Sequence, residues 1–221
     1  MKKTIFILPV ILAASFSFAQ MPEKFVKAME AKMAAIDTTI SVQGLTDLAN
    51  SFERIAEAEK NQWLPYYYAA YCNATAGLIV GSEGDMMIAK ADKTDPYADK
   101  AEKLISKAEA LEKNSSEIFV IKKMIATLRM MGDVMSRAQT YMPEAASMLA
   151  EAKKLNPGHP RVYILEAQDK YFTPEQFGGS KDEAKVLFEK AKQLFETFKP
   201  ASTVHPNWGK NTVTYFLSQY K

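Results

Sequence analysis

After residue 20, apolar residues recur along the chain at the spacing of an amphipathic helix. In the stretch 143–167, apolar residues at i, i+4 and i+7 share one helix face: Ala145, Leu149 and Ala152. The Asn-Pro-Gly sequence at 156–158 ends this helix, and Pro160 suits the first turn of a second one, where its missing N–H is harmless. The stretch therefore predicts two helices that fold back on each other.

The same periodicity predicts helices along the rest of the chain. Asp95-Pro96 reads as a helix start, because an N-cap acid precedes a proline, and Ser116 reads as the cap of the next helix. Ser180 and Glu183 have the spacing of a capping box. The expected helices are 22–37, 45–60, 62–79, 96–113, 116–132, 143–155, 160–172, 181–198 and 207–220. No stretch reads as a strand of useful length, so the predicted class is all-α.

Several of these helices repeat one pattern. An apolar stripe recurs in four of them: Leu48, Phe52 and Ile55; Ala101, Ile105 and Ala108; Ala145, Leu149 and Ala152; Ala184, Phe188 and Ala191. Others pair a bulky residue with a small one a turn later: Tyr66 with Ala70, Tyr163 with Ala167, and Trp208 with Thr212. This resembles the tetratricopeptide repeat (TPR), a helix pair of about 34 residues with Ala-x3-Phe in its second helix and a late proline, which Pro157 matches. Phe119, followed by Lys123, departs from the pattern.

The resemblance implies a tetratricopeptide-like right-handed α-solenoid of about four antiparallel helical hairpins plus a C-terminal capping helix, in one domain at 20–221. Register places the residues in excess of the repeat length in three loops, 80–94, 132–142 and 173–180, which should emerge along one edge. The segments 135–141, 171–179, 198–200 and 205–209 are similar to those of a group of exported bacterial TPR-containing proteins. That similarity implies a compartment and no reaction.

The first 19 residues read as a secretory signal peptide. Lys2 and Lys3 precede the apolar run 5–18, and Ser17-Phe18-Ala19 places small residues before the cleavage position. The run is shorter than the about 20 apolar residues of a bilayer span, and no later stretch reaches that length. We therefore expect a mature chain, residues 20–221, that is periplasmic or secreted and has no membrane span.

Charge and cysteine content argue against several classes of protein. The net charge is +2, and cleavage removes two lysines and no acid, so the mature chain is close to neutral and does not have a nucleic-acid-binding profile. Lysines and acids alternate along the predicted helices, as on a solvated surface. Cys72 is the single cysteine, so no intramolecular disulfide is possible, and we expect a small buried side chain rather than a nucleophile.

The sequence offers little for catalysis, a cofactor or a metal ion. His159 and His205 both lie in His-Pro turns and read as turn residues, and no zinc-protease, nucleophile-elbow or phosphate-loop motif is present. Glu83 and Asp85 lack the acidic density of a calcium loop. We expect no catalytic residue, no metal and no cofactor. A hydrolase that uses loop carboxylates is the weakest alternative.

Two sets of side chains are candidates for partner binding. Helix 62–79 carries more aromatic residues than one buried face can take, so at least one tyrosine should line the concave groove of the solenoid. The loop edge supplies the second set. The candidates are Tyr67, Tyr68 and Tyr71 in the groove, with Arg137, Tyr141, Gln176 and Phe177 in the loops.

The expected function is that of an exported TPR-like scaffold that binds a protein or peptide partner of the cell envelope through its concave face and loop edge. The alternative is a periplasmic small-ligand-binding accessory protein of a solute transporter, which predicts an apolar cavity between the helices. The sequence leaves the partner's identity, the binding surface and the oligomeric state open.

Overall fold

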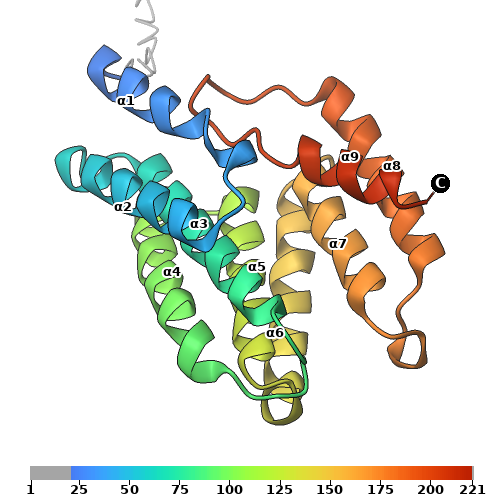
Figure 1. Cartoon of the computed structure of the whole chain (residues 1–221). Coiled ribbons are helices and arrows are strands. Elements are labelled where there is room, and N and C mark those ends of the chain that lie inside the picture. The colour runs from blue at the N-terminus through green and yellow to red at the C-terminus, as the bar shows by residue number, and fades with distance from the viewer. Residues whose placement is uncertain (1–20, 221) are drawn as a thin grey trace, which may run out of the picture.

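The computed structural model describes residues 21–220, which form helices joined by mostly short connections (Figure 1). The α-helices are α1 (Glu23–Met33), α2 (Val42–Ala58), α3 (Trp63–Ser82), α4 (Ala91–Leu111), α5 (Ser116–Gly132), α6 (Val134–Leu155), α7 (Pro160–Phe172), α8 (Lys181–Thr197) and α9 (Lys210–Ser218). Two 3-10 turns are η1 (Ile36–Thr38) and η2 (Glu175–Phe177). No strand occurs within residues 21–220, and the all-α prediction is confirmed for them. The signal peptide predicted at 1–19 lies outside the described residues.

The helices from α2 to α6 lie side by side, each antiparallel to the next (Figure 1). α7 and α8 form a further antiparallel pair, which meets the first set only over a short stretch of α5 and α6. α9 packs on α8, and α1 lies next to α2. The segment 198–209, between α8 and α9, returns toward α1, so N-terminal and C-terminal parts of the chain meet at the upper end of the molecule in Figure 1.

The predicted apolar stripes form the core. α2 buries one face, as its period requires, through Leu45, Leu48, Ala49, Phe52 and Ala56. α3 is buried on most sides, because α2, α4 and α5 all pack against it. The small residues expected beneath bulky neighbours are in place, with exposed fractions of 8% for Ala145 and 0% for Ala152, Ala184 and Ala191.

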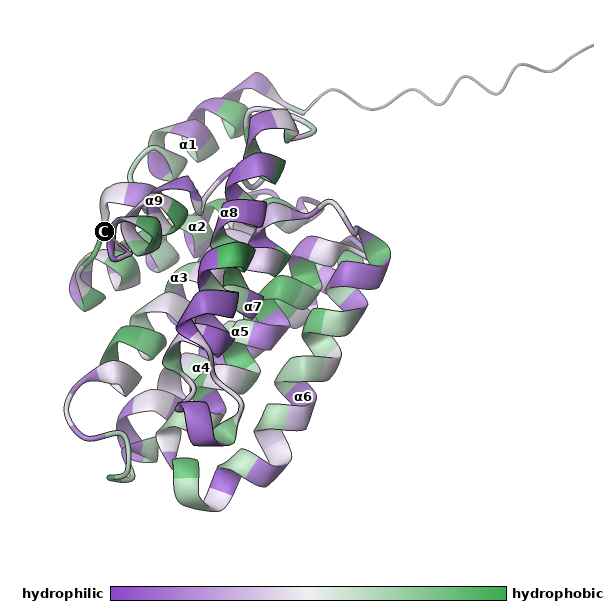
Figure 2. Ribbon diagram, turned by 90° about the vertical axis from the view of Figure 1, so that its right-hand side faces the viewer, coloured by the Kyte–Doolittle hydropathy of each residue, from purple (hydrophilic) through white to green (hydrophobic). Residues whose placement is uncertain are grey.

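The buried residues fall into two clusters. The larger one joins α1 through α7 and includes Val204 and Trp208 of the segment 198–209. The smaller one joins α7, α8 and α9 around Phe188 and Phe216, whose rings stack 4.6 Å apart. Hydrophilic residues cover much of the outward face of α8 (Figure 2). The α7–α9 unit thus has a core of its own, and α7 contributes to both clusters.

α4 begins at Ala91, more than a turn before the start predicted at Pro96. Lys90 holds this extra turn in place. Its backbone N–H donates to the carbonyl of Gly132 at 2.7 Å, and its ammonium donates to the carbonyls of Gly81 and Glu83 at 3.1 and 2.6 Å. Carbonyls at a helix end need such donors. These tertiary contacts outweigh the start signal of Asp95-Pro96.

α6 begins at Val134, so the prediction that 133–142 is irregular is wrong. Asp133 caps the helix by accepting the N–H of Ser136 at 3.2 Å. Arg137 then donates to both carboxylate oxygens of Asp95, at 2.7 and 2.9 Å, which ties the start of α6 to α4. These contacts stabilise two turns of helix ahead of Pro143.

The three inter-helix connections predicted at one edge do lie at the same end, the lower one in Figure 1. The first two are shorter than predicted, because the extra residues lengthen α3, α4 and α6 instead of forming loops, and the third keeps its predicted bounds. Two loops remain, at 83–90 and 173–180. The second contains η2 and ends in the predicted capping box, in which the Ser180 hydroxyl accepts the N–H of Glu183 at 3.1 Å.

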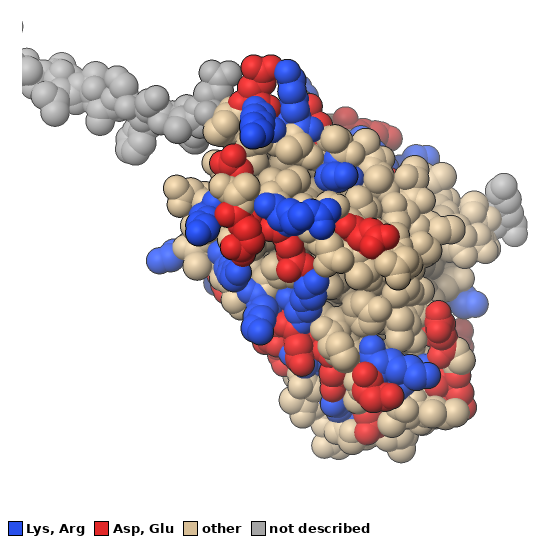
Figure 3. Space-filling view, turned by 60° about the vertical axis from the view of Figure 1, so that its left-hand side comes forward, with Lys and Arg blue, Asp and Glu red and all other residues tan. Residues whose placement is uncertain are grey.

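The surface of the described residues carries both signs of charge. Ion pairs link α2 to α4 through Lys100 with Glu53 and Lys107 with Glu57. Basic and acidic side chains alternate over this side of the molecule (Figure 3). No helix among residues 21–220 combines the length and the apolar composition that a membrane span requires.

A methyl group added to α3 at Gly77 should destabilise the fold by about 1–3 kcal/mol, the usual cost of overpacking. Its Cβ would lie 2.4 Å from Cδ2 of Leu128 and 2.8 Å from Cβ of Tyr97, so α5 and α4 would have to move. Chemical denaturation of Gly77→Ala measures the effect. Gly158→Ala is the matched control, because its Cβ meets nothing nearer than 3.6 Å. Equal stability of both variants would contradict the close packing of α3.

Candidate functional site

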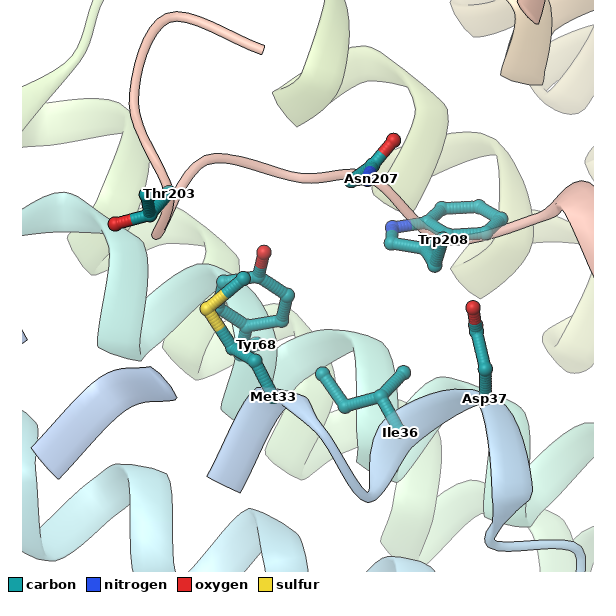
Figure 4. Close-up of a pocket in the computed structure, with 7 residues that line it drawn as sticks. All are labelled: Met33, Ile36, Asp37, Tyr68, Thr203, Asn207 and Trp208. Carbon is teal, nitrogen blue, oxygen red and sulfur yellow. The ribbon is translucent and has the colours of Figure 1, made fainter. Parts of the chain in front are cut away.

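A cavity of about 170 Å³ opens where η1, α3 and the segment 198–209 meet (Figure 4). Its walls come from three distant parts of the chain: Met33, Ile36, Asp37, Tyr68, Thr203, Asn207 and Trp208. Met33, Ile36, Tyr68 and Trp208 supply apolar surface. Asp37, Thr203 and Asn207 are exposed and supply polar groups at its rim. The site therefore combines two aromatic rings, a thioether and a hydrogen-bonding rim.

The segment 198–209 has no regular secondary structure and is held by side chains. The hydroxyl of Tyr68 donates to the carbonyl of Val204 at 3.4 Å. The Ser202 hydroxyl accepts the N–H of Val204 at 3.3 Å and lies 2.7 Å from Nδ1 of His205. These bonds fix the wall of the cavity opposite η1.

Gly209 ends this segment with φ at +108°, a conformation that favours glycine. Its Cβ would also lie 2.7 Å from Cδ1 of Ile164, so a side chain there would push the segment away from α7. Glycine at this position lets Trp208 turn into the cavity wall before α9 begins.

Asp37 faces this segment from the other side of the cavity. Partial burial raises the pKa of its carboxyl above the usual value. The nearby backbone N–H of Gly209 and the positive charges of Arg161 and Lys210 oppose that shift. Asp37 therefore lies between η1 and the start of α9, and its carboxylate interacts electrostatically with Arg161 and Lys210.

Beneath the cavity lies a buried network of charged groups centred on Glu117. Arg161 has an exposed fraction of 0% and His159 of 1%. Nε of Arg161 donates to Oε2 of Glu117 at 3.1 Å, Nη2 donates to Oε1, and Nε2 of His159 lies 3.0 Å from Oε1. Charges removed from water need such partners, because an unpaired one is very costly.

The network is bonded directly to the cavity wall. The indole N–H of Trp208 donates to the Tyr67 hydroxyl at 2.9 Å, and that hydroxyl donates to Oε2 of Glu117 at 3.0 Å. Nη1 of Arg161 donates to the Trp208 carbonyl at 3.4 Å, and the guanidinium lies over the rings of Phe198 and Trp208. Arg161 and Glu117 thus set the position of Trp208.

Ser116 joins this network instead of capping α5 as predicted. The N-cap residue of α5 is Ser115, which makes no side-chain cap bond. The Ser116 hydroxyl donates to the carbonyl of Ala152 at 2.8 Å and lies 2.7 Å from Nδ1 of His159. His159 occupies the N-cap position of α7, as a turn residue should, but its ring is buried between α5 and α7.

Two of the three tyrosines predicted to line a groove lie inside the molecule. Tyr67 and Tyr68 have exposed fractions of 0% and 1%, so the expectation of a partner surface at these two positions is corrected. α3 is enclosed by three helices, which leaves no free face at its start. Tyr71 is half-buried and packs on Trp208, with ring centroids 4.5 Å apart. Tyr68 nevertheless lines the cavity.

The predicted loop-edge residues divide in two. Arg137 and Tyr141 belong to α6, and Arg137 is engaged by Asp95, so the expectation of a loop at these positions is corrected. Gln176 and Phe177 do lie in a loop and are exposed, with Phe177 at 72%. The structure does not bring this pair to the cavity.

The described residues contain no cluster of side chains suited to hold a metal ion. Cys72 is buried, as predicted, and burial raises the pKa of its thiol to about 12, so it stays protonated. His205 is half-buried against Trp63, and burial lowers the pKa of its ring. The cavity presents a polar rim of Asp37, Thr203 and Asn207, and the rings of Tyr68 and Trp208 lie almost fully buried behind it, 1% and 6% exposed.

Glu117 and Arg161 were not predicted, because a charged residue in the first turn of a helix usually lies at the surface. The register of the repeat contains a signal for them. Glu117 stands two residues before Phe119, and Arg161 stands two residues before Tyr163. Phe119 and Tyr163 are equivalent in that register. Glu117 and Arg161 therefore occupy equivalent repeat positions, one in α5 and one in α7.

Fold and site together define a class: an all-helical protein of antiparallel helix pairs, in which N-terminal and C-terminal segments border a small open cavity. No protein-family model and no curated protein matches the chain. Among solved structures, the HusA haemophore from Porphyromonas gingivalis matches with a TM-score of 0.75 and 33% identity, over 91% of this chain and 95% of that chain. The chain belongs to the family of this haemophore.

Proposed function

We propose that this chain is an exported carrier that binds haem or a closely related tetrapyrrole in the cavity beside Trp208. The observation that carries the proposal is the extent of its similarity to a haemophore, at 33% identity over 91% of the chain. The site is consistent with that ligand, because a tetrapyrrole is a flat and largely apolar ring with carboxylates at one edge. Thr203 and Asn207 offer hydrogen bonds at the rim, and the rings of Tyr68 and Trp208, which are 1% and 6% exposed in this conformation, would offer aromatic surface once the two walls part.

The size of the cavity limits how such a ligand sits. Sites that enclose a small molecule usually measure about 300–1,000 Å³, whereas this one measures about 170 Å³. It accommodates part of the ring and leaves the remainder outside. Full enclosure requires η1 and the segment 198–209 to separate, which means breaking the contact between Asp37 and Gly209. The proposed ligand therefore binds in an open cleft, or after the two walls part.

The first test is a titration of the mature chain with haemin, followed by absorbance and by tryptophan fluorescence. The chain contains two tryptophans, so Trp63→Phe leaves Trp208 as the single reporter. Saturable absorbance changes and quenching of Trp208 are the expected results. Saturable binding without quenching would move the ligand away from this cavity, and absence of binding would contradict the proposal itself.

The sulfur of Met33 is the natural ligand for a haem iron among the cavity residues. Methionine is one of the side chains that bind haem iron, and tyrosine is another. The hydroxyl of Tyr68 already donates a hydrogen bond to the carbonyl of Val204. The thioether of Met33 is half-buried and makes no such bond.

Met33→Leu should therefore weaken haemin binding by about tenfold while leaving the affinity for iron-free protoporphyrin IX within about twofold. Leucine keeps the apolar volume and removes the sulfur. Isothermal calorimetry with both ligands measures the two affinities. Met135→Leu is the control, because Met135 is 72% exposed and does not line the cavity. Equal loss for both ligands would indicate that Met33 contributes packing and not a bond to iron.

Three further expectations belong to the same proposal. The chain forms a tetratricopeptide-like right-handed solenoid of about four antiparallel helical hairpins with a C-terminal capping helix, and the recurrent register of small and bulky residues supports this proposal. The chain acts in the periplasm or outside the cell after loss of residues 1–19. It carries its ligand without catalysis. Amino-terminal sequencing of the protein recovered from the cell envelope tests the export step.

A further inference from the structure

The loop between α3 and α4 exposes four consecutive apolar residues, Met86 to Ala89. The exposed fractions are 44% for Met86, 59% for Met87 and 64% for Ile88. Runs of this kind are avoided on soluble proteins unless they serve a function, because they promote non-specific association. Single exposed apolar residues need no explanation, but a continuous run does.

Hydrogen bonds tie both ends of this loop. Oδ1 of Asp85 accepts the N–H of Met87 at 2.8 Å, and Gly84 supplies a positive φ of 69°. At the other end, the Lys90 ammonium donates to the carbonyls of Gly81 and Glu83, and its backbone N–H donates to Gly132. These bonds restrict the backbone of the loop and so lower the ordering cost of presenting its apolar side chains to a partner.

A second cavity, of about 340 Å³, lies against this loop. Val80, Ile88 and Ala89 provide apolar lining. Its charged residues are three acids, Glu83, Asp85 and Asp92, and two lysines, Lys90 and Lys93. Lys90 is buried, and its ammonium donates hydrogen bonds to two backbone carbonyls. Of the two lysines in the lining, Lys93 is the exposed one. The rim of this cavity is acidic toward an incoming partner.

We propose that residues 83–90 and this cavity form a docking surface for a basic and apolar segment of a partner protein. Methionine is enriched at protein interfaces, where its flexible thioether adapts to different shapes. The acidic rim favours a partner that carries lysine or arginine. It disfavours a lipid surface, since peripheral membrane binding relies on basic residues near anionic headgroups.

The docking surface lies far from the proposed ligand site. Tyr68 is near the start of α3, and the loop follows the end of that helix, so the rise per residue separates them by about 20 Å. The two sites lie at opposite ends of the molecule in Figure 1. A ligand and a partner protein can therefore bind at the same time.

The experiment uses the mature chain labelled with 13C at the methionine methyl groups, and two synthetic amphipathic helical peptides that carry leucine at i, i+3, i+4 and i+7 and either lysine or glutamate at the remaining positions. The lysine peptide should shift the Met86 and Met87 signals and bind at least about tenfold more tightly than the glutamate peptide. Equal binding of both peptides, or no binding of either, would overturn the proposal.

Variants separate this surface from general stickiness. The triple variant Met86→Ser, Met87→Ser, Ile88→Ser should lose about tenfold in affinity for the lysine peptide, and Glu83→Gln with Asp92→Asn should lose several-fold. Val186→Ser is the matched control, because Val186 is 63% exposed on α8. An equal loss in the control would contradict the assignment. Haemin binding by the triple variant should be unchanged, which keeps this test independent of the proposed function.

A separate experiment tests whether the loop binds a membrane instead of a protein. Sedimentation with vesicles of phosphatidylcholine, with and without phosphatidylglycerol, measures binding to lipid. The wild-type chain should remain in the supernatant. Vesicle binding that the triple variant abolishes would assign the loop to a lipid surface and overturn the protein-docking proposal.

Discussion

Replacement of Arg161 by methionine is expected to destabilise the fold by about 3–5 kcal/mol, the range found when one partner of a buried ion pair is removed. The substitution keeps an apolar stem of similar length and removes the charge that Glu117 faces. Glu117 would retain only His159 and Tyr67 as partners in the network. Urea denaturation followed by circular dichroism measures the free energy of unfolding.

The same variant should also bind the proposed ligand more weakly. This loss of affinity should be larger than the fraction of unfolded protein alone accounts for. Arg161 donates to the Trp208 carbonyl and lies over the Trp208 ring, so its loss frees the cavity wall. Fluorescence of Trp208, in the background of Trp63→Phe, reports that change directly. Quenching by iodide should increase if the indole becomes exposed.

Arg129→Met is the matched control for this prediction. Arg129 also pairs with two acids, Asp99 and Glu102, but both acids are more than half exposed. Exposed ion pairs contribute about 0–1 kcal/mol. An equal loss of stability in the two arginine variants would mean that burial of the Glu117 network has no special importance.

A double-mutant cycle separates the ion pair from the packing of the two side chains. Glu117→Gln alone leaves Arg161 charged and without a counter-charge, whereas Glu117→Gln with Arg161→Met removes both charges. The double variant should therefore be more stable than the sum of the single losses predicts, by about 1–3 kcal/mol of coupling. Additive losses would indicate that Glu117 and Arg161 act independently.

Most helices could be predicted from the sequence, because the side chains that form the core also set the period. The stripe of Ala184, Phe188 and Ala191 predicts α8 almost to its ends, and all three residues are buried. The errors occur where tertiary contacts determine the residue at which a helix begins. Neither Lys90, which satisfies the end of α3, nor Asp95, which holds Arg137, signals its distant partner in the local sequence.

The candidate site was less predictable than the fold, because it depends on residues that meet only after folding. Trp208 was identified as the bulky member of a packing pair, and it does pack, with Tyr71. Its position in a cavity wall depends on Asp37 and Asn207, which lie at opposite ends of the chain. No periodicity connects such positions. The aromatic excess of α3 did point to the right helix, although Tyr67 and Tyr68 face inward.

Acid is expected to remove about 3 kcal/mol of stability through Glu117 alone. Burial raises the pKa of this carboxyl, but the charges of Arg161 and His159 and their hydrogen bonds outweigh it and lower the pKa from 4.5 to about 2. A group with a lowered pKa in the folded state stabilises the fold above its unfolded pKa and ceases to do so as the pH falls through the folded value. The loss should therefore occur between about pH 5 and pH 2.

Urea denaturation from pH 6 to pH 2 measures this loss, and Glu117→Gln identifies its source. The variant should be less stable than the wild type at pH 6 and should show a flatter profile, so the two curves converge near pH 2. Glu109→Gln is the control, because Glu109 pairs with Lys122 outside the buried network, where an ion pair contributes little to stability.

Asp37 should act in the opposite sense. Its pKa is raised in the folded state, so the folded chain holds that proton more tightly and gains stability as the pH falls. Asp37→Asn removes this gain and should make the acid loss steeper than in the wild type. A wild-type slope in Glu117→Gln would instead assign the acid loss to the surface carboxylates Asp95 and Asp133, whose pKa values are also lowered. Opposite changes in the two variants would show that the buried network and the cavity rim titrate as separate groups within one site.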